Sequence, residues 1–253
     1  MTTHLPTGGT MIRTSDEVRL CVEGHLADDP VAAVVVVHGF CASKDEANVV
    51  AVAEQLAGLG VDVYRYDARG HGASGGQCTL GQAERHDVAA VVTEARRRCE
   101  RVVLVGASMG AVAALHYAAS DPQLSGVVTV SSPAWWRITG PQTVLAAGMT
   151  QTGLGRWLVR RYLRVRLASD QRRPAEPTEL VRHVLAPVAV IHGTADRFIP
   201  ARSAEPLAAA AGGPSRHVLV PGMGHAFQDA ALEPIRGAVE WILSYATTAS
   251  APA

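Results

Sequence analysis

The fold is decided by residues 102–110, which read Val-Val-Leu-Val-Gly-Ala-Ser-Met-Gly. An apolar strand runs directly into a serine, Ser108, and the residues from Met109 to Ala119 have the length and composition of a helix. This strand-turn-helix with the pattern G-x-S-x-G is typical of a nucleophile elbow, which holds the serine in a strained backbone conformation with its hydroxyl exposed. Gly106 and Gly110 fit this interpretation, because neighbouring backbone comes very close at those two positions.

On both sides of the elbow, short runs rich in Val and Ile alternate with longer helical stretches. The runs expected to be buried strands are Val31–Val37, Val61–Tyr66, Val102–Val105, Val127–Val130, Val188–Ile191 and Val218–Val220. The stretches expected to be helices are Glu46–Leu59, Gly81–Arg98, Met109–Ala119, Ser203–Ala211 and Ala230–Tyr245. This alternation predicts an α/β fold with a mostly parallel sheet flanked by helices. An antiparallel hairpin of Thr10–Arg13 and Arg19–Glu23 at one edge completes an expected sheet of eight strands.

One long segment, Pro133–Pro187, interrupts this rhythm with no good strand. An insertion after a strand, bounded by prolines, predicts a helical cap over the carboxyl edge of the sheet. The expected organisation is therefore a core of residues 1–132 and 188–253 with a cap of residues 133–187. The cap carries Trp135, Trp136 and Trp157, which are candidates to line a substrate pocket or, alternatively, to wedge the cap onto the sheet.

Two later loops supply a candidate acid and a candidate base. The strand Val188–Ile191 runs into a loop that presents Asp196, and the last strand is followed by a glycine-rich loop that presents His225. In a Ser-Asp-His set, the histidine removes the serine proton and returns it to the leaving group, while the carboxylate fixes the histidine tautomer. His192 and His217 are alternative bases. Both lie at strand ends inside the sheet pattern, which favours His225.

A tetrahedral oxyanion needs two N–H donors. One is expected from Met109, the residue after the serine, and the other from Phe40, in the loop that follows the strand ending at Val37. We expect His38 to brace this loop, and the neighbouring Cys41 to be a packing residue rather than a second nucleophile.

Several motifs carry a family resemblance. They are His38-Gly39-Phe40 followed by Lys44-Asp45-Glu46, the run from Asp67 to Ser74, the run from Ile191 to Asp196, and Gly224-His225-Ala226-Phe227. With them the chain resembles the α/β-hydrolase superfamily over nearly its whole length. Within it, the chain looks most like the serine aminopeptidase-like (monoglyceride lipase-like) group, including small bacterial cinnamoyl or feruloyl esterases.

This resemblance implies Ser108, Asp196 and His225 as a catalytic triad and the N–H groups of Phe40 and Met109 as the oxyanion hole. Met109 is a departure, because many such esterases carry Gln there, and its side chain is expected to alter the acyl pocket. His71, in the Asp67–Ser74 motif, is expected to be structural. Resemblance of fold does not supply the substrate.

Composition excludes several other classes. Lys plus Arg and Asp plus Glu number 23 each, so the whole molecule has no electrostatic bias toward nucleic acid or membrane. The four cysteines form no CxxC pair, and no His, Asp or Cys cluster has metal-ligand spacing, so neither a metal nor an organic cofactor is expected. The first ten residues lack the pattern of a secretory signal, and the longest apolar run is too short to span a bilayer. A cytoplasmic protein with reduced thiols and no stable membrane insertion is the expectation.

The expected cap is strongly basic. From Pro122 to Ser169 the chain has six arginines and no acidic residue. One helical stripe contains Leu154, Trp157, Leu158, Tyr162 and Val165, and another contains Arg156, Arg160 and Arg164. One interpretation is a solvated basic face above a packed apolar face. The other is a docking surface for an anionic partner such as an acyl carrier protein, a carboxylated small molecule or a phosphate-bearing acyl donor.

The leading hypothesis is a serine hydrolase that cleaves a small-molecule carboxylic ester through an acyl-enzyme on Ser108. An alternative uses the same residues for thioester release, acyl transfer or carboxylate elimination on a biosynthetic, polyketide-type intermediate. A wet, open site favours hydrolysis, whereas a dry, capped site favours transfer or elimination. A non-catalytic binding protein on the same fold is a third hypothesis, disfavoured by the complete set of candidate residues.

Overall fold

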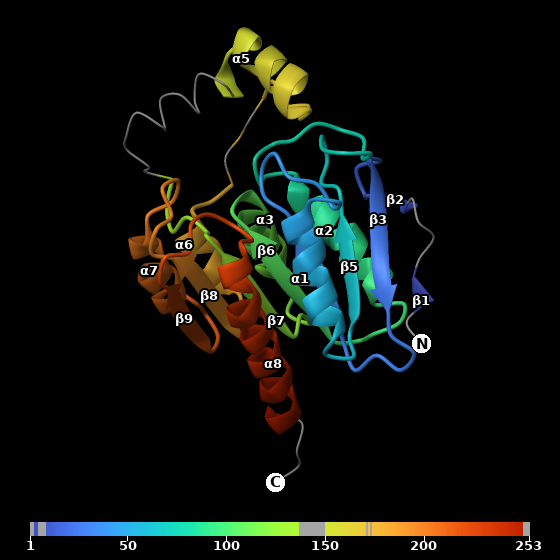
Figure 1. The fold of residues 1–253 in the computed structure, drawn as a ribbon, viewed down its shortest axis with the longest axis vertical. Helices are drawn as coiled ribbons and strands as arrows, with labels where there is room; N and C mark the ends of the chain where they lie inside the picture. Colours follow the sequence, from blue (N-terminus) through green and yellow to red (C-terminus); the bar gives the residue numbers. More distant parts are fainter. Residues whose placement is uncertain (1–2, 5–8, 137–149, 171, 173, 250–253) are drawn as a thin grey trace.

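The computed structural model describes residues 3–4, 9–136, 150–170, 172 and 174–249 (Figure 1). In this part of the chain nine strands form one sheet in the order β1-β3-β5-β4-β6-β7-β8-β9, with β2 also paired to β3. The strands are β1 (Thr3–His4), β2 (Thr10–Arg13), β3 (Arg19–Leu26), β4 (Ala33–Val37), β5 (Asp62–Tyr66), β6 (Val102–Ala107), β7 (Gly126–Val130), β8 (Val188–Gly193) and β9 (Ser215–Val220). The strands from β5 and β4 across to β9 are parallel, and β3 is antiparallel to β5.

The predicted α/β fold with a mostly parallel sheet is confirmed. The ninth strand arises at the edge, where β1 and β2 both pair with β3, at Leu26 and at Val22 respectively. They share one position at the border of the sheet, so eight positions across the sheet hold nine strands. The predicted hairpin of β2 and β3 is present.

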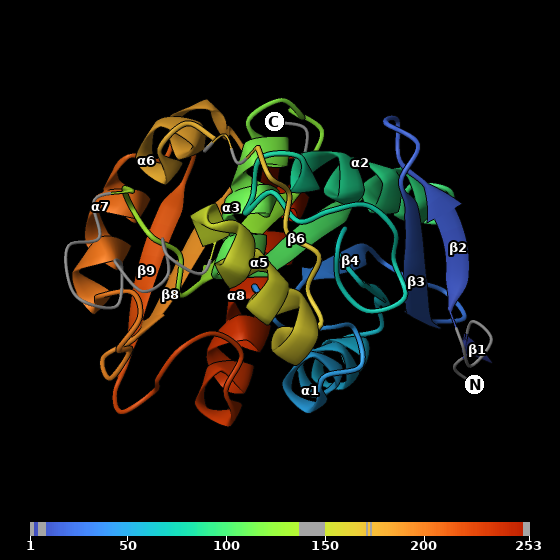
Figure 2. The ribbon, with the colours of Figure 1, turned by 90° about the horizontal axis from the view of Figure 1, so that it is seen from above.

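Helices cover both faces of the sheet, as Figures 1 and 2 show. The longer helices are α1 (Ala47–Ala57), α2 (Glu84–Ala95), α3 (Met109–Ala118), α7 (Ala204–Ala209) and α8 (Leu232–Ala249). Apolar side chains of α1 and α8 pack on one face, and those of α2, α3 and α7 on the other. Strand β4 shows why the predicted strands are apolar at every position. Val34 and Val36 are buried on the face covered by α1 and α8, while Val35 and Val37 are buried on the face covered by α2, α3 and α7.

Strand β9 begins three residues earlier than predicted, at Ser215. It lies at the border of the sheet, and its burial alternates between exposed and half-buried positions along Ser215–Leu219. The apolar run from Val218 to Val220 therefore marked only the part of the strand that lacks polar outward-facing side chains.

The described part of the expected cap contains α5 (Gly153–Leu158), which continues into a π-helical turn, η1 (Val159–Leu163). In Figure 1, α5 lies beyond the sheet edge at which the parallel strands end. The predicted packed apolar stripe is wrong for its outer members. Leu154, Trp157 and Tyr162 are 70%, 57% and 69% exposed, whereas Val165 of the predicted stripe is buried, together with Val159, which was not part of it. The π-helical turn shifts the phase of the helix, and Arg164 ends it in a left-handed conformation at φ 56°.

The final part of the expected cap segment lies on the main core. Helix α6 (Pro177–Leu180) and the 3₁₀ turn η2 (Val181–His183) follow the cap helix. Leu180, Val181 and Val184 are buried in the same cluster as α3 and α7. Helix α6 and η2 therefore pack on the layer that contains α3 and α7. Two further 3₁₀ turns are η3 (Ala201–Ser203) and η4 (Asp229–Ala231).

Candidate active site

Ser108 stands at the sharp turn between β6 and α3. Its backbone has φ 52° and ψ −116°, a conformation that L-residues rarely adopt. The turn is tight enough that a methyl group added at Gly106 would lie 2.6 Å from the carbonyl oxygen of Gly110. A methyl group at Gly110 would overlap the carbonyl oxygens of Val37 and His38. The two glycines of the motif are therefore required by backbone contact, as the sequence predicted.

The three candidate residues of the triad lie together. Ser108, Asp196 and His225 follow the parallel strands β6, β8 and β9, whose carboxyl ends share one edge of the sheet. The His225 Nε2 atom lies 3.0 Å from the Ser108 Oγ atom, and the His225 Nδ1 atom lies 2.8 Å from the Asp196 Oδ2 atom. This continuous hydrogen-bonded series is the arrangement in which a histidine acts as the base for a serine.

The Asp196 carboxylate is fully buried, with its side chain 0% exposed. Its Oδ1 atom accepts hydrogen bonds from the backbone N–H groups of Phe198 (2.8 Å) and Ile199 (2.9 Å), and its Oδ2 atom faces His225. Burial by itself raises the pKa of Asp196, but hydrogen bonds from His192, His225 and the Ile199 N–H group outweigh it and hold that pKa below the ordinary value. The carboxylate therefore stays ionised at neutral pH.

The loop that carries His225 is held against the loop that carries Asp196. The backbone N–H group of Ala195 donates to the carbonyl oxygen of Met223 over 2.9 Å, and a methyl group at Gly193 would overlap that same oxygen. On the other side, the N–H group of Ala226 donates to Ser131 Oγ over 3.1 Å. These contacts position His225, whose side chain is 23% exposed.

The alternative bases do not approach the serine. His192 is fully buried within β8, and its Nε2 atom lies 3.0 Å from the carbonyl oxygen of Ile199. His217 lies within β9, opposite Val190 of β8, and is exposed. His225 is thus the histidine that contacts Ser108.

The loop at Phe40 lies against the elbow. A methyl group at Gly39 would lie 3.4 Å from the Ser108 Cβ atom, so the loop and the serine are in van der Waals contact. Among the described residues, neither the Phe40 nor the Met109 backbone N–H group donates to a protein acceptor. Both backbone N–H groups that were predicted to form an oxyanion hole are therefore without a protein acceptor in the described part of the chain.

His38 braces this loop, as predicted. Its Nε2 atom accepts a hydrogen bond from the Ala68 N–H group over 3.0 Å, and its Nδ1 atom lies 2.7 Å from the Gly39 carbonyl oxygen, so the proton is on Nδ1. Complete burial, assisted by the neighbouring His71, lowers the pKa of His38 to about 4. The ring therefore remains neutral and supports the loop through hydrogen bonds alone.

The side chain of Met109 lies in the core. It is 7% exposed, and its Sδ atom lies 3.5 Å from the Sγ atom of Cys78. Met109 is not among the residues that line the pocket at Ser108. The expectation that this side chain alters the acyl pocket therefore finds no support in the pocket that the described residues form.

Ser108 and His225 open into a pocket of about 310 Å³. Its walls are the loop of residues 39–42, the start of α1 and the His225 loop as far as Phe227. Cys41 lies in this wall, where desolvation raises the pKa of its thiol to about 12, so the thiol is not an activated nucleophile. The polar side chains Glu46 and Asn48 also line the pocket. Sequence reasoning placed both in a helix and did not identify them as pocket residues.

The three tryptophans expected at the substrate pocket lie outside it, as the described residues form it. Trp135 packs against the core of the α2 and α3 face. Trp136 donates from Nε1 to the carbonyl oxygen of Pro174 over 3.0 Å, and Trp157 is largely exposed on α5. Trp135 fits the alternative interpretation, in which it attaches the cap segment to the sheet, and Trp136 links two ends of the cap segment.

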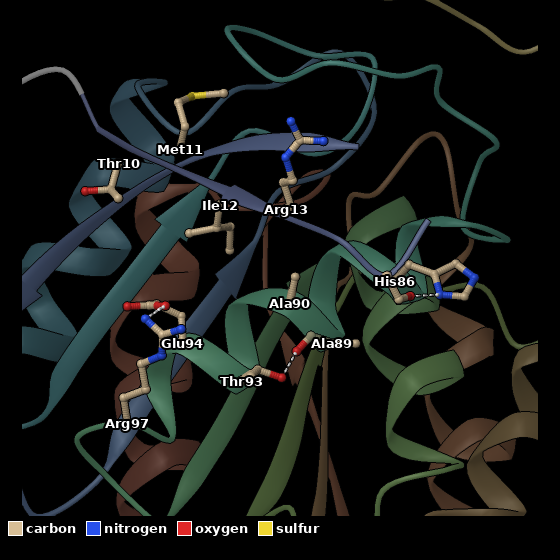
Figure 3. A pocket seen from close by; sticks show the side chains of 11 residues that line it. Thr10, Met11, Ile12, Arg13, His86, Ala89, Ala90, Thr93, Glu94 and Arg97 are labelled. Carbon is tan, nitrogen blue, oxygen red and sulfur yellow. Dashed lines mark hydrogen bonds and ion pairs between the residues drawn. The ribbon is translucent and has the colours of Figure 1, made fainter. Parts of the chain in front are cut away.

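A larger pocket, about 440 Å³, lies far from this chemistry between β2 and α2 (Figure 3). Its polar side chains already have protein partners. His86 Nδ1 lies 3.2 Å from Ser15 Oγ, and Arg97 pairs with Glu94 over 2.9 Å. The Ser15–His86 contact has no carboxylate hydrogen-bonded to the histidine ring among the described residues, whereas His225 at Ser108 is bonded to Asp196, so the smaller pocket at Ser108 is the candidate active site.

The sequence profile described as "Serine aminopeptidase, S33" matches residues 28–178, which is more than half of the chain. The chain belongs to the serine aminopeptidase S33 family. The match includes the Phe40 loop and the Ser108 elbow. Asp196 and His225 follow it, so their assignment depends on the geometry described above.

Relatives of this S33-family chain agree with the fold. An uncharacterized protein of Mycobacterium tuberculosis is 31% identical over 237 residues, which cover 87% of this chain and 73% of the mycobacterial one. The esterase Pf2001 of Pyrococcus furiosus has a similar structure, with a TM-score of 0.74 and 20% identity, over 97% of this chain and 91% of that one. Est1E of Butyrivibrio proteoclasticus, solved with ferulic acid, has a TM-score of 0.68 and 20% identity, over 93% and 98%. At these identities the two structures show the α/β-hydrolase fold.

Neither a metal-binding cluster nor a membrane-spanning helix is found among the described residues of the S33-family chain. Within the described ranges, no group of three or more His, Cys, Asp or Glu side chains is placed to hold a metal ion. Of the helices in those ranges, none has both the length and the apolar character needed to cross a membrane.

Proposed function

We propose that this S33-family protein is a carboxylic ester hydrolase that forms an acyl-enzyme on Ser108. The observation that carries the proposal is the hydrogen-bonded series from Ser108 Oγ through His225 to Asp196, over 3.0 Å and 2.8 Å, at the floor of an open pocket. A serine hydroxyl is a weak nucleophile until an adjacent base takes its proton. No other described histidine contacts this serine.

In the proposed reaction, His225 Nε2 takes the proton of Ser108 as Oγ attacks the ester carbonyl carbon. The oxyanion that forms accepts hydrogen bonds from the free N–H groups of Phe40 and Met109. The same histidine then protonates the departing alkoxide, and the acyl group remains on Oγ. Water, deprotonated by His225, attacks the acyl carbon, the bond from that carbon to Ser108 Oγ breaks, and His225 returns the proton to Oγ as the carboxylic acid leaves. Asp196 keeps the Nδ1 proton in place and stabilises the imidazolium in both halves of the reaction.

Hydrolysis is preferred over transfer or elimination because the pocket is open. His225 is 23% exposed, and the walls of the pocket carry polar and exposed side chains such as Glu46 and Asn48. Water has access to an acyl group held in such a site, whereas transfer and elimination require its exclusion.

We also propose that the described residues of the cap, from Thr150 to Asp170, form a lid at the carboxyl edge of the sheet. Arg160, Arg161 and Arg164 are exposed there, and no ion pair of the described residues engages them. These charges support an anionic partner or substrate group at the cap. The double change Arg160→Glu and Arg164→Glu is expected to raise KM for an anionic acyl donor several-fold at low salt. An unchanged KM with such donors, acyl carrier protein thioesters included, would remove this proposal.

The hydrolase proposal is tested with p-nitrophenyl esters of graded acyl length, supplied to the wild-type protein and to a Ser108→Ala variant. We expect turnover with an optimum in chain length, and a loss of about 10³-fold or more in the variant. Ser120, an exposed serine just after α3 whose hydroxyl donates to the Tyr117 carbonyl oxygen, is a matched control: Ser120→Ala is expected to retain most of the turnover. Equal turnover by wild type and Ser108→Ala would refute the proposal.

A further inference from the structure

The buried histidine of β8, His192, is not a base, yet it faces the candidate acid. Its side chain is 0% exposed, its Nε2 atom lies 3.0 Å from the Ile199 carbonyl oxygen, and the same atom lies 3.5 Å from Asp196 Oδ2. Both neighbours are hydrogen-bond acceptors, so the His192 proton must be on Nε2. One N–H group thus points at the turn after Asp196 and at its carboxylate.

The turn from Asp196 to Ile199 connects the Asp196 carboxylate to His192 through the backbone of Ile199. Ile199 gives its N–H group to Asp196 Oδ1 over 2.9 Å and its carbonyl oxygen to His192. Oδ1 is therefore fixed by backbone that His192 anchors, while Oδ2 is shared between His225 at 2.8 Å and the more distant His192. His192 acts on the carboxylate in two ways, by position through Ile199 and by charge through Oδ2.

The charge state of His192 follows from its other nitrogen. The Nδ1 atom is buried, and within the described residues it has no hydrogen-bond partner. An imidazolium would place a second N–H group there without an acceptor, which is unfavourable in a buried site. His192 is therefore neutral, and it donates to Asp196 without cancelling the negative charge that His225 needs. His192 and His225 are the two titratable groups that contact Asp196 in the described part of the chain.

We propose that His192 is a positioning residue for the acid of the active site: its Nε2–H group anchors the turn that fixes Asp196 and shares the Asp196 charge with His225. This inference rests on the proposed function, since it assigns a role in the Ser108 reaction. It gives the histidine of Ile191-His192-Gly193-Thr194-Ala195-Asp196 a task other than proton transfer from serine.

The test compares three substitutions. His192→Gln places an amide N–H donor near the Nε2 position, His192→Asn places a donor too short to reach it, and His192→Phe keeps the ring without a donor. With Phe or Asn we expect kcat to fall about tenfold, because the turn that fixes Asp196 loses its anchor at the Ile199 carbonyl oxygen, while KM stays within roughly twofold. With Gln we expect recovery to within about threefold of wild type. If the Phe variant does not fold, the Asn and Gln pair carries the test.

The pH profile is the readout that a purely structural role would not move. Without the His192 donor, Asp196 Oδ2 is no longer shared with a second imidazole, so more of the Asp196 charge acts on His225. His225 then takes up a proton more readily, so the acidic limb of the kcat/KM profile moves to higher pH, by about half a unit in the Phe or Asn variant. In the Gln variant the limb returns toward its wild-type position.

The outcomes separate this inference from the hydrolase proposal. The reaction is established first, by wild-type turnover that disappears in Ser108→Ala. If the wild type shows no such turnover, the hydrolase proposal fails, and this failure is separate from a failure of the role assigned to His192. Given that reaction, a Gln variant as impaired as the Asn variant would overturn the inference, because the donor would not be the group that matters. Unchanged kcat and an unmoved acidic limb in the Asn and Phe variants would overturn it as well.

Discussion

Replacing Asp196 with asparagine removes a charge and leaves the shape of the site nearly unchanged. In the native site, Oδ1 accepts two backbone N–H groups, from Phe198 and Ile199. An amide must present its oxygen to these donors, which turns its NH₂ group toward His225 Nδ1. That nitrogen can then bond the amide only as an acceptor, so the imidazole proton moves to Nε2 and faces Ser108 Oγ, 3.0 Å away. The base would then donate where it has to accept.

The magnitude follows from this reversal of the tautomer. The asparagine variant keeps the Phe40 and Met109 donors and the pocket, but not the proton acceptor. We expect kcat for a p-nitrophenyl ester to fall by about 10⁴-fold, as is typical when the acid of a Ser-His-Asp triad becomes an amide. This loss corresponds to about 5 kcal/mol of transition-state stabilisation.

The assay measures kcat and KM at neutral pH, beside the thermal midpoint of each variant. Asp229→Asn is the matched control, because it makes the same change at an exposed carboxylate that has no hydrogen bond or ion pair among the described residues. The control is expected to retain wild-type kcat. An Asp196→Asn variant that folds normally and retains more than a tenth of the wild-type kcat would refute the tautomer argument.

Three further predictions concern the elbow, the oxyanion loop and the pocket. Gly110→Ala places a methyl group against the carbonyl oxygens of Val37 and His38, so we expect a loss of about 2 kcal/mol or more of stability and of most turnover; a wild-type thermal midpoint would contradict this. The pKa of His38 is about 4 in the folded protein, below the ordinary value of about 6.5 for the unfolded chain, so its contribution is complete above pH 6.5 and is lost as the pH falls toward 4. Urea titrations should show the free energy of unfolding of the wild type falling by up to about 3 kcal/mol between pH 6.5 and pH 4 because of His38, and that of His38→Gln falling by less. An equal fall in the two proteins would exclude the histidine as the cause. Glu46 lines the pocket, so Glu46→Gln should raise KM for an ester with an ammonium group about threefold at low salt and leave a neutral isostere unchanged; equal effects on both would argue against a charge contact.

The candidate catalytic residues were predictable because their signals are local. Ser108 follows a continuous apolar strand and has a glycine on each side at the positions where backbone crowds it, and Asp196 and His225 follow two further strands of the same parallel set. Parallel strands bring their carboxyl ends to one edge, so order along the chain was enough to predict that the three side chains meet.

The pocket was not predictable in the same way. Exposed residues at the start of a helix, such as Glu46 and Asn48, leave no periodic signal, and only the tertiary structure shows that they face Ser108. The tryptophans were assigned to the pocket by residue type and by their place after a strand, which does not reveal the direction of a side chain. The apolar stripe of the cap was wrong for Leu154 and Trp157, which lie on the exposed side of α5, and for Tyr162, where a π-helical turn breaks the regular period that the prediction assumed.

The role of His192 could not be predicted from the sequence either. From sequence His192 was an alternative base, disfavoured by its place at a strand end, and the pattern offered no other role for it. Its contact with the carbonyl oxygen of Ile199, seven residues later, depends on the path of the turn and has no marker in the composition of the segment.

The central claim is that Ser108 is the nucleophile, and the most direct measurement is intact-mass spectrometry of the protein quenched during turnover of a p-nitrophenyl ester, followed by peptide mapping. The account predicts one acyl group per chain, located on the peptide that contains Ser108. It also predicts no adduct in Ser108→Ala and much slower formation of the adduct in Asp196→Asn. An acyl group located instead on Cys41 or Ser131, or turnover that persists in Ser108→Ala, would contradict it.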